Sequence, residues 1–465
     1  MSEYKTTIAA ISTPAGIGGV AVIRVSGQES IEIADKIFTP RRNKNLLSKQ
    51  DTNTVVFGSI VTKEEVIDDV LVSVFRTPRS FTGEDTVEIS CHGSIYIEQQ
   101  ILKLLIEQGC RLAYPGEFSQ RAFLNGKMDL SQAEAVADLI ASTSESSHRM
   151  AVSQMRGNFS NKLYELREKL LYFVSLIELE LDFNEEDVEF ADRGKLKELA
   201  LNIESSISKL ADSFSVGNVL KNGIPVALVG ETNVGKSTLL NLLLNEEKAI
   251  VSDIHGTTRD LIEDSVVIQG ITFRFIDTAG IRETEDRIEN LGIERTYKTI
   301  EQASIILWLI DSTQVSEHIE WLTERIENRA EGKKIILVFN KIDKLDGEEY
   351  IVLDELFERF AADRIYISAK NHINTDELQD ALVKAAQLPE VHSGDVIVSN
   401  IRHYEALQNA NVAIKRVIDG LGSDISHDLL SQDIRECMHF LGEITGQIST
   451  DEILGNIFSR FCIGK

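Results

Sequence analysis

The first 125 residues combine short runs of alternating apolar and polar positions with two stretches of helical periodicity. The alternating runs predict strands at 20–25, 55–61, 70–75 and 87–90. Apolar residues recur with helical spacing in 31–37 and 95–108, which predicts two helices. This segment is therefore expected to form a mixed α/β domain.

Helical periodicity dominates from residue 130 to about residue 214 and returns after residue 389. The apolar residues on repeating faces of the first stretch are Ala133, Ala137, Ile140, Leu163, Leu166, Leu170, Phe173 and Ile177. The acidic stretch 182–187 interrupts this pattern and predicts a turn. Two later helices are predicted at 404–421 and 429–441, and we expect both helical stretches to pack together.

Strands and helices alternate between these two helical stretches, as far as Ala386. The predicted strands are 226–229, 266–269, 272–276, 305–310, 335–339 and 365–367. Such alternation is typical of a mostly parallel, doubly wound sheet. The predicted fold class is therefore α/β plus α, with an α/β unit inserted into a helical domain. The predicted domain segments are 1–125, 126–217, 218–383 and 384–465.

The composition fits an ordinary globular chain. With 465 residues, 43% of them apolar and 26% charged, the chain has room for two to four domains. No apolar run is long enough to cross a bilayer, and the first ten residues lack a secretory pattern, so we expect a cytoplasmic location and no membrane partner. The four cysteines form no Cys-x-x-Cys pair, which indicates neither a zinc site nor a disulfide framework.

The net charge of −26 argues against a protein that coats nucleic acid generically. The charge is uneven, because residues 1–125 carry 13 basic and 15 acidic side chains and are nearly neutral. If an RNA binds, this segment repels it least, and local basic patches must supply the attraction.

A phosphate-binding loop is the first chemical signal. Gly230-Glu-Thr-Asn-Val-Gly-Lys-Ser237 follows a predicted buried strand and opens a helix, which is the context that this motif requires. Backbone N–H groups and the helix N-terminus bind phosphate oxygens there. We expect Lys236 to contact the β- and γ-phosphates and the Ser237 hydroxyl to reach Mg²⁺.

Three further motifs occur in the order typical of a GTPase. Asp277-Thr-Ala-Gly280 offers a carboxylate to the magnesium shell and an N–H to the γ-phosphate. Asn340-Lys-Ile-Asp343 offers a carboxylate that accepts hydrogens from the guanine edge, which adenine lacks. Ser368-Ala-Lys370 places backbone N–H groups near the guanine oxygen, and Thr257 or Thr258 is expected to ligate Mg²⁺ as the first switch.

These motifs define the expected nucleotide contacts. The GTP-binding residues are predicted to be Gly230, Asn233, Val234, Gly235, Lys236, Ser237, Thr238, Thr257, Asp277, Gly280, Asn340, Lys341, Asp343, Ser368, Ala369 and Lys370. Ser237, Thr258 and Asp277 are predicted to hold Mg²⁺.

From the residues alone, several side chains are candidates for orienting the water that hydrolyses GTP. Ile281 occupies the position at which Ras-like enzymes carry a water-orienting Gln, so another group must substitute or turnover must be slow. The nearby candidates are Arg282, Glu283, Glu285, Asp286 and Glu289. Asn233, inside the phosphate loop, either ligates a monovalent cation that offsets phosphate charge or has a structural role.

Taken together, the motifs resemble the MnmE (TrmE) family of tRNA-modification GTPases over the whole chain. The G-domain segments of this resemblance are the Asn-containing phosphate loop, the switch 256–260, Asp277–Glu283 and Asn340–Asp343. The remaining segments are Thr13–Gly19, Arg24–Gly27, Ser80–Asp85, Cys91–Gly93, Pro115–Lys127 and the terminal Cys462-Ile-Gly-Lys465. Ser94 departs slightly from the family pattern, which commonly has a second Gly there.

The resemblance implies an N-terminal folate-binding and dimerisation domain, a helical domain in two segments and an inserted Ras-like G domain. It also implies a homodimer that joins a flavoprotein partner, MnmG (GidA), in a heterotetramer. Together they would add a carboxymethylaminomethyl or aminomethyl group to C5 of the wobble uridine, U34, of certain tRNAs. The implied one-carbon donor is 5-formyl- or 5,10-methylene-tetrahydrofolate.

The same resemblance assigns individual residues. It implies folate contacts at Arg24, Glu88, Lys127 and Lys465, and it selects Glu289 as the water-orienting carboxylate. It implies a potassium site that includes Asn233, Ser252, Ile254 and Thr257, ordered when G domains dimerise. It also makes Cys462 a candidate nucleophile or acid in one-carbon transfer.

Two alternatives remain open from the residues alone. The G domain by itself also fits a ribosome-assembly GTPase that binds rRNA and modifies nothing. A folate enzyme with a G domain that has lost its role is the other alternative. The N-terminal signature and Cys462 speak against the first alternative, because an assembly factor has no need of them.

Overall fold

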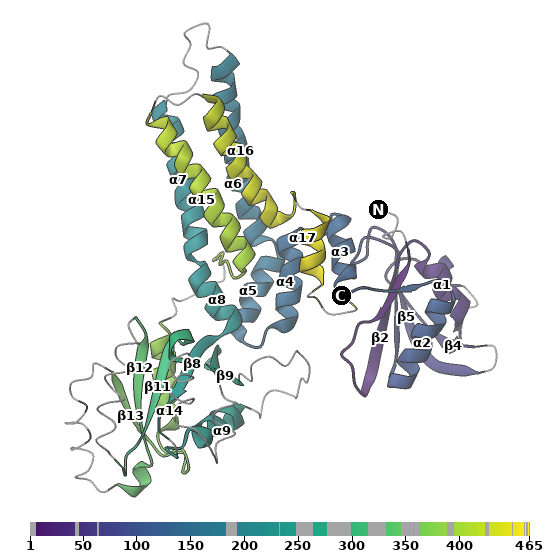
Figure 1. Ribbon diagram of the computed structural model, residues 1–465. Coiled ribbons are helices and arrows are strands. Elements are labelled where there is room, and N and C mark those ends of the chain that lie inside the picture. The colour runs from purple at the N-terminus through teal and green to yellow at the C-terminus, as the bar shows by residue number, and fades with distance from the viewer. Residues whose placement is uncertain are drawn as a thin grey trace. The chain divides into compact units, whose positions relative to one another are not determined.

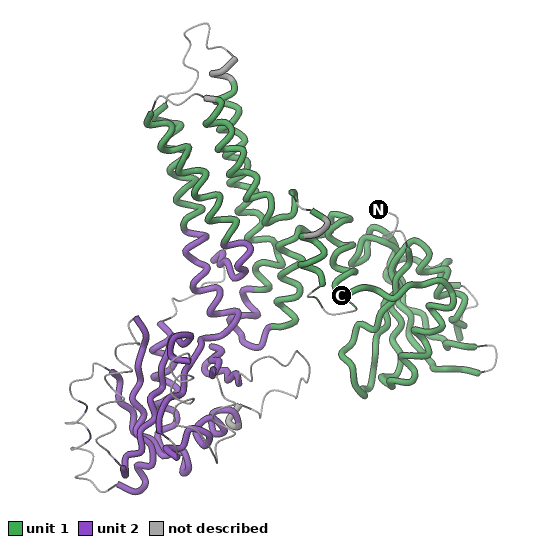
Figure 2. Tube along the Cα trace, in the orientation of Figure 1, with its two compact units in different colours: residues 1–141, 151–208, 405–465 green, residues 142–150, 209–404 purple. Residues whose placement is uncertain are grey.

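The computed structural model describes most of the chain. Its described residues exclude 1–5, 42–45, 63–64, 183–192, 232, 248–263, 277–298, 315–331, 346–352, 354–356, 358–361, 388–394, 424–426, 449, 460, 462–463 and 465. The chain divides into two compact units, shown in Figure 2. The first contains residues 1–141, 151–208 and 405–465, and the second contains 142–150 and 209–404.

The four domain segments expected from the sequence do not coincide with these units, because residues 142–150, 209–217 and 384–404 of the expected helical segments belong to the second unit. The expected boundaries stay predictions. No helix within the described residues is both long and apolar enough to cross a membrane.

A seven-stranded sheet forms the N-terminal part of the first unit (Figure 1). In sheet order its strands are β3 (Phe38–Pro40), β4 (Thr54–Val61), β5 (Val66–Phe75), β6 (Thr86–Gly93), β2 (Gly18–Ser26), β1 (Ile8–Ile11) and β7 (Arg111–Leu112). Neighbouring strands are antiparallel, except that β1 and β7 are parallel. The predicted strands are confirmed, whereas β1, β3 and β7 were not predicted.

Helices α1 (Ser30–Ile37) and α2 (Ile95–Glu107) bury their apolar stripes against this sheet. Ile31 from α1 and Ile101 from α2 share one core with strand residues such as Val72 and Ile89. Alternate strand residues enter this core, which explains why the period-two pattern identified β4, β5 and β6. A short 3-10 helix, Leu47–Lys49, follows β3.

The helical part consists of the segments outside the two sheets. Its helices are α3 (Glu117–Leu124), α4 (Leu130–Ala141), α5 (Glu145–Met155), α6 (Asn158–Asp182), α7 (Arg193–Asp212), α8 (Phe214–Asn222), α15 (Ile401–Leu421), α16 (His427–Thr445) and α17 (Asp451–Phe458). The predicted face of α6 is fully buried from Leu163 to Ile177. On α4, Ala133 is buried but Ile140 is exposed.

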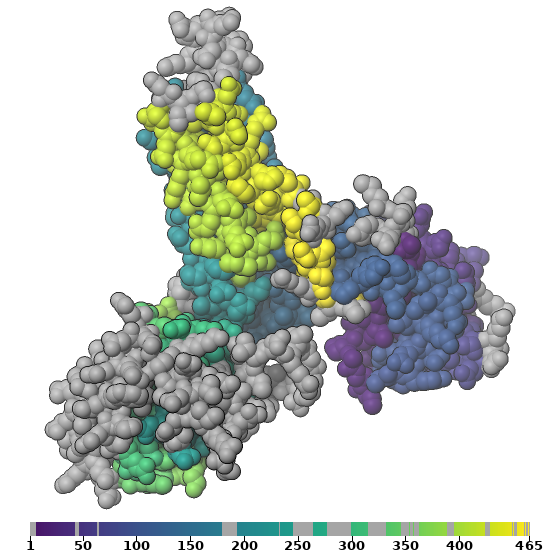
Figure 3. Space-filling view, viewed as in Figure 1, coloured from purple at the N-terminus to yellow at the C-terminus, as the bar shows by residue number. Residues whose placement is uncertain are grey.

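The two helical stretches of the sequence pack together, as expected. Helix α16 lies along α6, and Arg435 of α16 pairs with Glu178 of α6. Figure 3 shows the yellow C-terminal helices against the teal helices of the same bundle. The α/β segment is therefore inserted into a helical domain, and this prediction is confirmed.

The second unit contains a six-stranded sheet. In sheet order its strands are β13 (Asp363–Ile367), β12 (Lys334–Asn340), β11 (Ile305–Asp311), β8 (Ile224–Val229), β10 (Ile271–Ile276) and β9 (Asp264–Ile268). All pairs are parallel except β9 with β10. Separate apolar cores cover the two faces, and α9 (Lys236–Glu247) and α14 (Thr375–Ala386) belong to this unit. The doubly wound prediction is confirmed.

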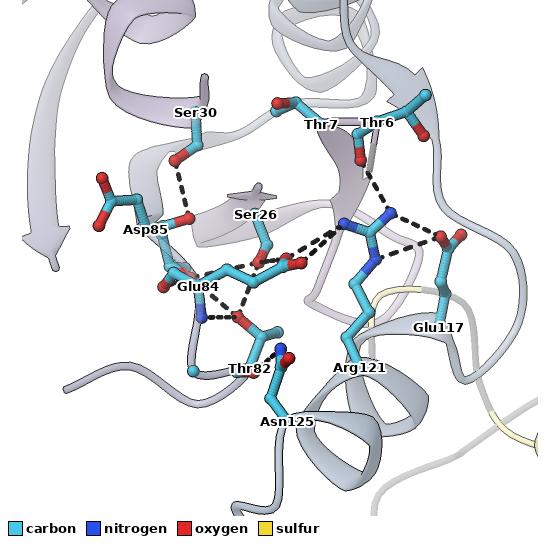
Figure 4. Close-up of polar contacts among 12 residues, drawn as sticks. Thr6, Thr7, Ser26, Ser30, Thr82, Glu84, Asp85, Glu117, Arg121 and Asn125 are labelled. Atoms are coloured by element: carbon cyan, nitrogen blue, oxygen red, sulfur yellow. Dashed lines mark hydrogen bonds and ion pairs between the residues drawn. The ribbon is translucent and has the colours of Figure 1, made fainter. Parts of the chain in front are cut away.

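A buried ionic network holds the N-terminal signature segments together (Figure 4). Arg121 of α3 is 2% exposed and pairs with Glu84 at 3.1 Å and with Glu117 at 2.9 Å. Its guanidinium also donates to the carbonyl oxygen of Thr6, and Ser26 donates to Glu84. The 80–85 loop and α3 are therefore fixed to β1 and β2 by one buried cation.

Glu117 is the second centre of this network. Burial alone would raise the pKa of Glu117, but hydrogen bonds from Arg111, from the Tyr114 N–H and from Arg121 outweigh burial and lower it. Because the folded-state pKa lies below the ordinary value of 4.5, the pairing stabilises the fold above that pH. The contribution is lost as the pH falls through the lowered pKa.

Substituting Arg121 by Met should destabilise the N-terminal sheet by about 3 kcal/mol, because two carboxylates lose their buried cation. The measurement is native-state hydrogen exchange of peptides from β2 and β6. Arg41→Met is the matched control, since Arg41 pairs with Asp69 at the surface and its loss should cost under about 1 kcal/mol. Equal exchange in the two variants would contradict this role of Arg121.

Candidate functional site

The phosphate loop connects β8 to α9 through residues that need unusual backbone angles. Gly230 and Gly235 have φ angles of 156° and 104°. A Cβ atom on Gly235 would lie 2.3 Å from the side-chain nitrogen of Asn340, so only glycine fits there. Val234 is buried between them and anchors the loop.

Lys236 opens α9 with its ammonium folded over the loop. Its Nζ atom donates to the carbonyl oxygens of Gly230 and Glu231, each at 2.6 Å. Burial lowers the pKa of Lys236, and an anion beside the amine would offset that penalty. Ser237 and Thr238 follow on the first turn of α9. A hydroxyl beside a half-buried ammonium at a helix N-terminus fits a magnesium-bound phosphate.

The Asn340 side chain joins three of the predicted motifs. Its Nδ2 atom donates to the carbonyl oxygen of Val234 at 2.8 Å, and its Oδ1 atom accepts from the Ala369 N–H at 3.0 Å. The residue is 3% exposed, so both bonds are shielded from water. The phosphate loop, the end of β12 and the segment after β13 are thereby held at one edge of the sheet.

Lys341 adds a second link between the motifs. It adopts left-handed backbone angles, with φ of 70°, and its Nζ atom donates to the carbonyl oxygen of Asn233 at 2.9 Å. The same ammonium pairs with Asp311 at the end of β11. Burial would raise the pKa of Asp311, but hydrogen bonds from Lys341 and Thr313 outweigh it and lower the pKa.

Asp311 was not among the predicted site residues. A sequence signal existed, because Asp311 ends a strand that is otherwise entirely apolar, Ile305–Ile310. A carboxylate at the carboxyl end of a buried parallel strand belongs to the edge at which ligands bind.

Asp343 and Ser368 meet on this edge as well. Asp343 lies in a 3-10 turn, Ile342–Lys344, and its Oδ1 atom accepts a hydrogen bond of 2.6 Å from the Ser368 hydroxyl. That hydrogen bond lowers the pKa of Asp343, so the carboxylate stays ionised and able to accept hydrogens from a base. Lys370 follows in the exposed turn.

Several predicted site residues lie outside the described residues. They are Ser252, Ile254, Thr257, Thr258, Asp277, Gly280, Glu289, Cys462 and Lys465. Their assignments to magnesium, potassium, folate and catalysis stay predictions.

The structure brings Arg24 and Glu88 together among the folate candidates. They are register partners on β2 and β6, and the Arg24 guanidinium pairs with the Glu88 carboxylate at 2.8 Å. The guanidinium also lies 5.4 Å from the centre of the Phe81 ring and 5.6 Å from that of Phe118. Phe118 is fully buried, so the planar cation, the carboxylate and the half-buried Phe81 ring are the groups that fit a flat, polar heterocycle.

The Lys127 side chain contacts the loop that carries Phe81. Its Nζ atom donates to the carbonyl oxygen of Pro78 at 2.9 Å, three residues before Phe81. Near the C-terminus, the carbonyl oxygen of Gly464 accepts a hydrogen bond of 3.1 Å from the Ser12 hydroxyl, just after β1. The terminal segment is therefore attached to the N-terminal sheet.

Comparisons with known proteins agree with this arrangement. The model of the TrmE N-terminus matches residues 7–127, and the MnmE helical domain model matches residues 130–462. A protein of Bacteroides thetaiotaomicron named tRNA modification GTPase MnmE is 61% identical over 99% of this chain and 100% of its own length. The protein of that name from Parabacteroides distasonis is 57% identical over 99% and 100%.

Among solved structures, Aquifex aeolicus Era bound to GDP and aluminium fluoride is 31% identical over 40% of this chain and 65% of its own length, with a TM-score of 0.28.

A doubly wound sheet whose phosphate loop, Asn-Lys-x-Asp and Ser-Ala-Lys segments are joined by hydrogen bonds defines a P-loop GTPase. The chain belongs to the MnmE family of tRNA modification GTPases, since two family models and full-length relatives match it. The match over both units disfavours the ribosome-assembly alternative.

Replacing Asp343 by Asn should shift the preferred nucleotide from GTP toward xanthosine triphosphate, because the amide donates where the carboxylate accepts. Competition binding against labelled GDP measures the shift. Asp363→Asn is the matched control, since Asp363 begins β13 and pairs with Lys384 at the surface. Unchanged preference for GTP in Asp343→Asn would remove this residue from the base pocket.

Proposed function

We propose that this chain hydrolyses GTP as a homodimer while it modifies the wobble uridine, U34, of certain tRNAs. With a flavoprotein partner of the MnmG (GidA) type in a heterotetramer, it adds a carboxymethylaminomethyl or aminomethyl group to C5. A 5-formyl- or 5,10-methylene-tetrahydrofolate is the one-carbon source. The observation that carries the proposal is the full-length match to the MnmE relatives, together with the joined guanine-reading segments.

In the GTP site, Lys236 stabilises the charge that develops on the β- and γ-phosphates. Asp343 selects guanine, and Ser237, Thr258 and Asp277 are the residues that would hold magnesium, which supplies further charge neutralisation when bound. Glu289 orients the water that attacks the γ-phosphorus. The bond from this phosphorus to the bridging oxygen then breaks, and GDP and inorganic phosphate leave.

Potassium is proposed at the phosphate loop. Asn233, Thr257 and the backbone carbonyls of Ser252 and Ile254 would hold the ion. G-domain dimerisation would order the loop that contains Ser252 and Ile254. Asn233 supports this proposal because it has left-handed backbone angles, with φ of 62°, and an exposed side chain. Lys341 already occupies its carbonyl oxygen, so the amide side chain is the group left to bind a cation.

The folate site is proposed at Arg24, Glu88, Lys127 and Lys465. Arg24 and Glu88 form a donor–acceptor pair beside the half-buried Phe81 ring, which suits recognition of a pterin edge. Lys127 and Lys465 add positive charge for the glutamate carboxylates. Cys462 is proposed as the nucleophile or acid of the transfer. Two residues further along, the carbonyl oxygen of Gly464 accepts a hydrogen bond from Ser12.

GTP hydrolysis should be faster in potassium than in sodium at equal ionic strength, because sodium is too small to bridge the loop and the phosphates. Replacing Asn233 by Ala should remove most of that difference while GDP binding is retained. Asn222→Ala, at the end of α8, is the control and should keep the potassium effect. Equal wild-type rates in the two salts would refute the cation site.

Cells that lack this chain should contain tRNA without the C5 substituent at U34, and nucleoside analysis of that tRNA by mass spectrometry tests the proposed function. Expression of the wild-type chain should restore the modified nucleoside. Expression of Cys462→Ser should not, although the purified variant should hydrolyse GTP at the wild-type rate. Normal U34 modification in cells without the chain would refute the proposed function, and restoration by Cys462→Ser would refute only the role of the thiol.

A further inference from the structure

A polar cavity of about 400 Å³ lies within the first unit, away from the Arg24–Glu88 pair. Three segments that are distant in sequence line it, namely 123–132, 156–164 and 445–447. The volume lies within the range of roughly 300–1,000 Å³ that small-ligand sites occupy. The cavity has room for one small ligand and is much too small for a folded partner.

The walls of this cavity are fixed by hydrogen bonds. Asp129 accepts from the Gln132 N–H at 2.9 Å, while the Gln132 side chain accepts from the Asp129 N–H at 3.0 Å. This reciprocal capping starts α4. Gln132 also donates to the Met155 carbonyl, and Ser131 bonds Ser160 of α6 at 2.9 Å. These hydrogen bonds hold the lining of the cavity in place without a ligand.

Four polar side chains that line the cavity take no part in these hydrogen bonds. Arg156, Asn161, Tyr164 and Gln447 form no side-chain hydrogen bond or ion pair with the described residues. Tyr164 is 37% exposed, although it lines the cavity. All four side chains are exposed and are available to contact a molecule in the cavity.

The charge of the lining favours an anion. Lys127 and Arg156 are its cations, and Asp129 is its carboxylate. The Oδ1 atom of Asp129 accepts hydrogen bonds from Ser131 and from the Gln132 N–H, which places this carboxylate at the N-terminus of α4. Arg156 has no carboxylate partner among the described residues and can bind a phosphate with its planar guanidinium.

We propose that this cavity receives one single-stranded nucleotide of the tRNA substrate, an inference that rests on the proposed function. Arg156 would bind a phosphate, Tyr164 would stack on the base, and Asn161 and Gln447 would form hydrogen bonds with its edge. A guanidinium, an aromatic ring and free amides are the set that single-stranded RNA requires. A polycarboxylate such as a poly-γ-glutamate chain would leave the ring and the amides unused.

The position of Lys127 supports this assignment. Lys127 lines the cavity and also bonds the 78–81 loop that carries Phe81 next to Arg24. Lys127 therefore connects the lining of the cavity to the loop of the proposed folate site.

The test measures binding of a fluorescein-labelled anticodon stem–loop RNA to the full chain by anisotropy at several salt concentrations. Tyr164→Ala should weaken binding about tenfold, because loss of one stacked base costs ~1–3 kcal/mol. Arg156→Ala should weaken it and lower the salt slope by about 0.7, the value for one phosphate of a single strand.

Matched controls lie on the neighbouring helices. Tyr172 lies two turns further along α6 and is 62% exposed, outside the cavity, so Tyr172→Ala should bind the RNA like the wild type. Arg149 of α5 pairs with Glu145, and Arg149→Ala should also bind normally. Thermal unfolding of all four variants checks that each is folded.

The outcomes separate this inference from the proposed function. Wild-type affinity in both Tyr164→Ala and Arg156→Ala would overturn the cavity assignment and leave the proposed function intact. An effect of Arg156→Ala alone, with displacement of the RNA by poly-γ-glutamate, would also overturn it in favour of a plain anion site. If the wild type binds no RNA, the inference falls, and the U34 analysis decides separately on the proposed function.

Discussion

The hydrogen bonds of one buried amide, that of Asn340, are the constraint on which the nucleotide site depends. Its two ends bond the phosphate loop at Val234 and the segment after β13 at Ala369. Each bond contributes about 1 kcal/mol, but losing one leaves a buried polar group unpaired, which costs more. The parallel sheet makes this possible, because β8, β12 and β13 all end at the same edge. Lys341 then ties the loop to Asp311, and Ser368 holds Asp343 for the base.

In the N-terminal part, buried ion pairs hold the segments together, as the buried Asn340 amide does in the second unit. Arg121 and Glu117 are almost fully buried and pair with each other, whereas the Arg24–Glu88 pair is half-buried and Lys127 is exposed. The family signature therefore contains two kinds of residue. Some, such as Glu84 and Arg121, fix the 80–85 loop, and others, such as Arg24, lie beside that loop. The rigidity of the first kind sets the geometry available to the second.

Periodicity predicted the elements that bury one regular face and missed those that do not. The run Ile8–Ile11 is too short and too uniformly apolar to show an alternation, and Arg111–Leu112 becomes a strand only by pairing with it. Helices α3 and α17 have eight residues each, and Thr450 caps α17 with its side chain. The four GTPase motifs were recognisable because backbone and base chemistry fix their residue types. The role of Asp311 and the burial of Arg121 were not recognisable, because they depend on Lys341 and on Glu84, which are distant in sequence.

The account requires that the segments joined by Asn340 form one guanine nucleotide site. Isothermal titration calorimetry of the purified chain with GDP and, separately, with ADP in the presence of magnesium measures this directly. We expect saturable heat with GDP at one nucleotide per chain and none with ADP. Absence of heat with GDP, or equal affinity for the two nucleotides, would contradict the account.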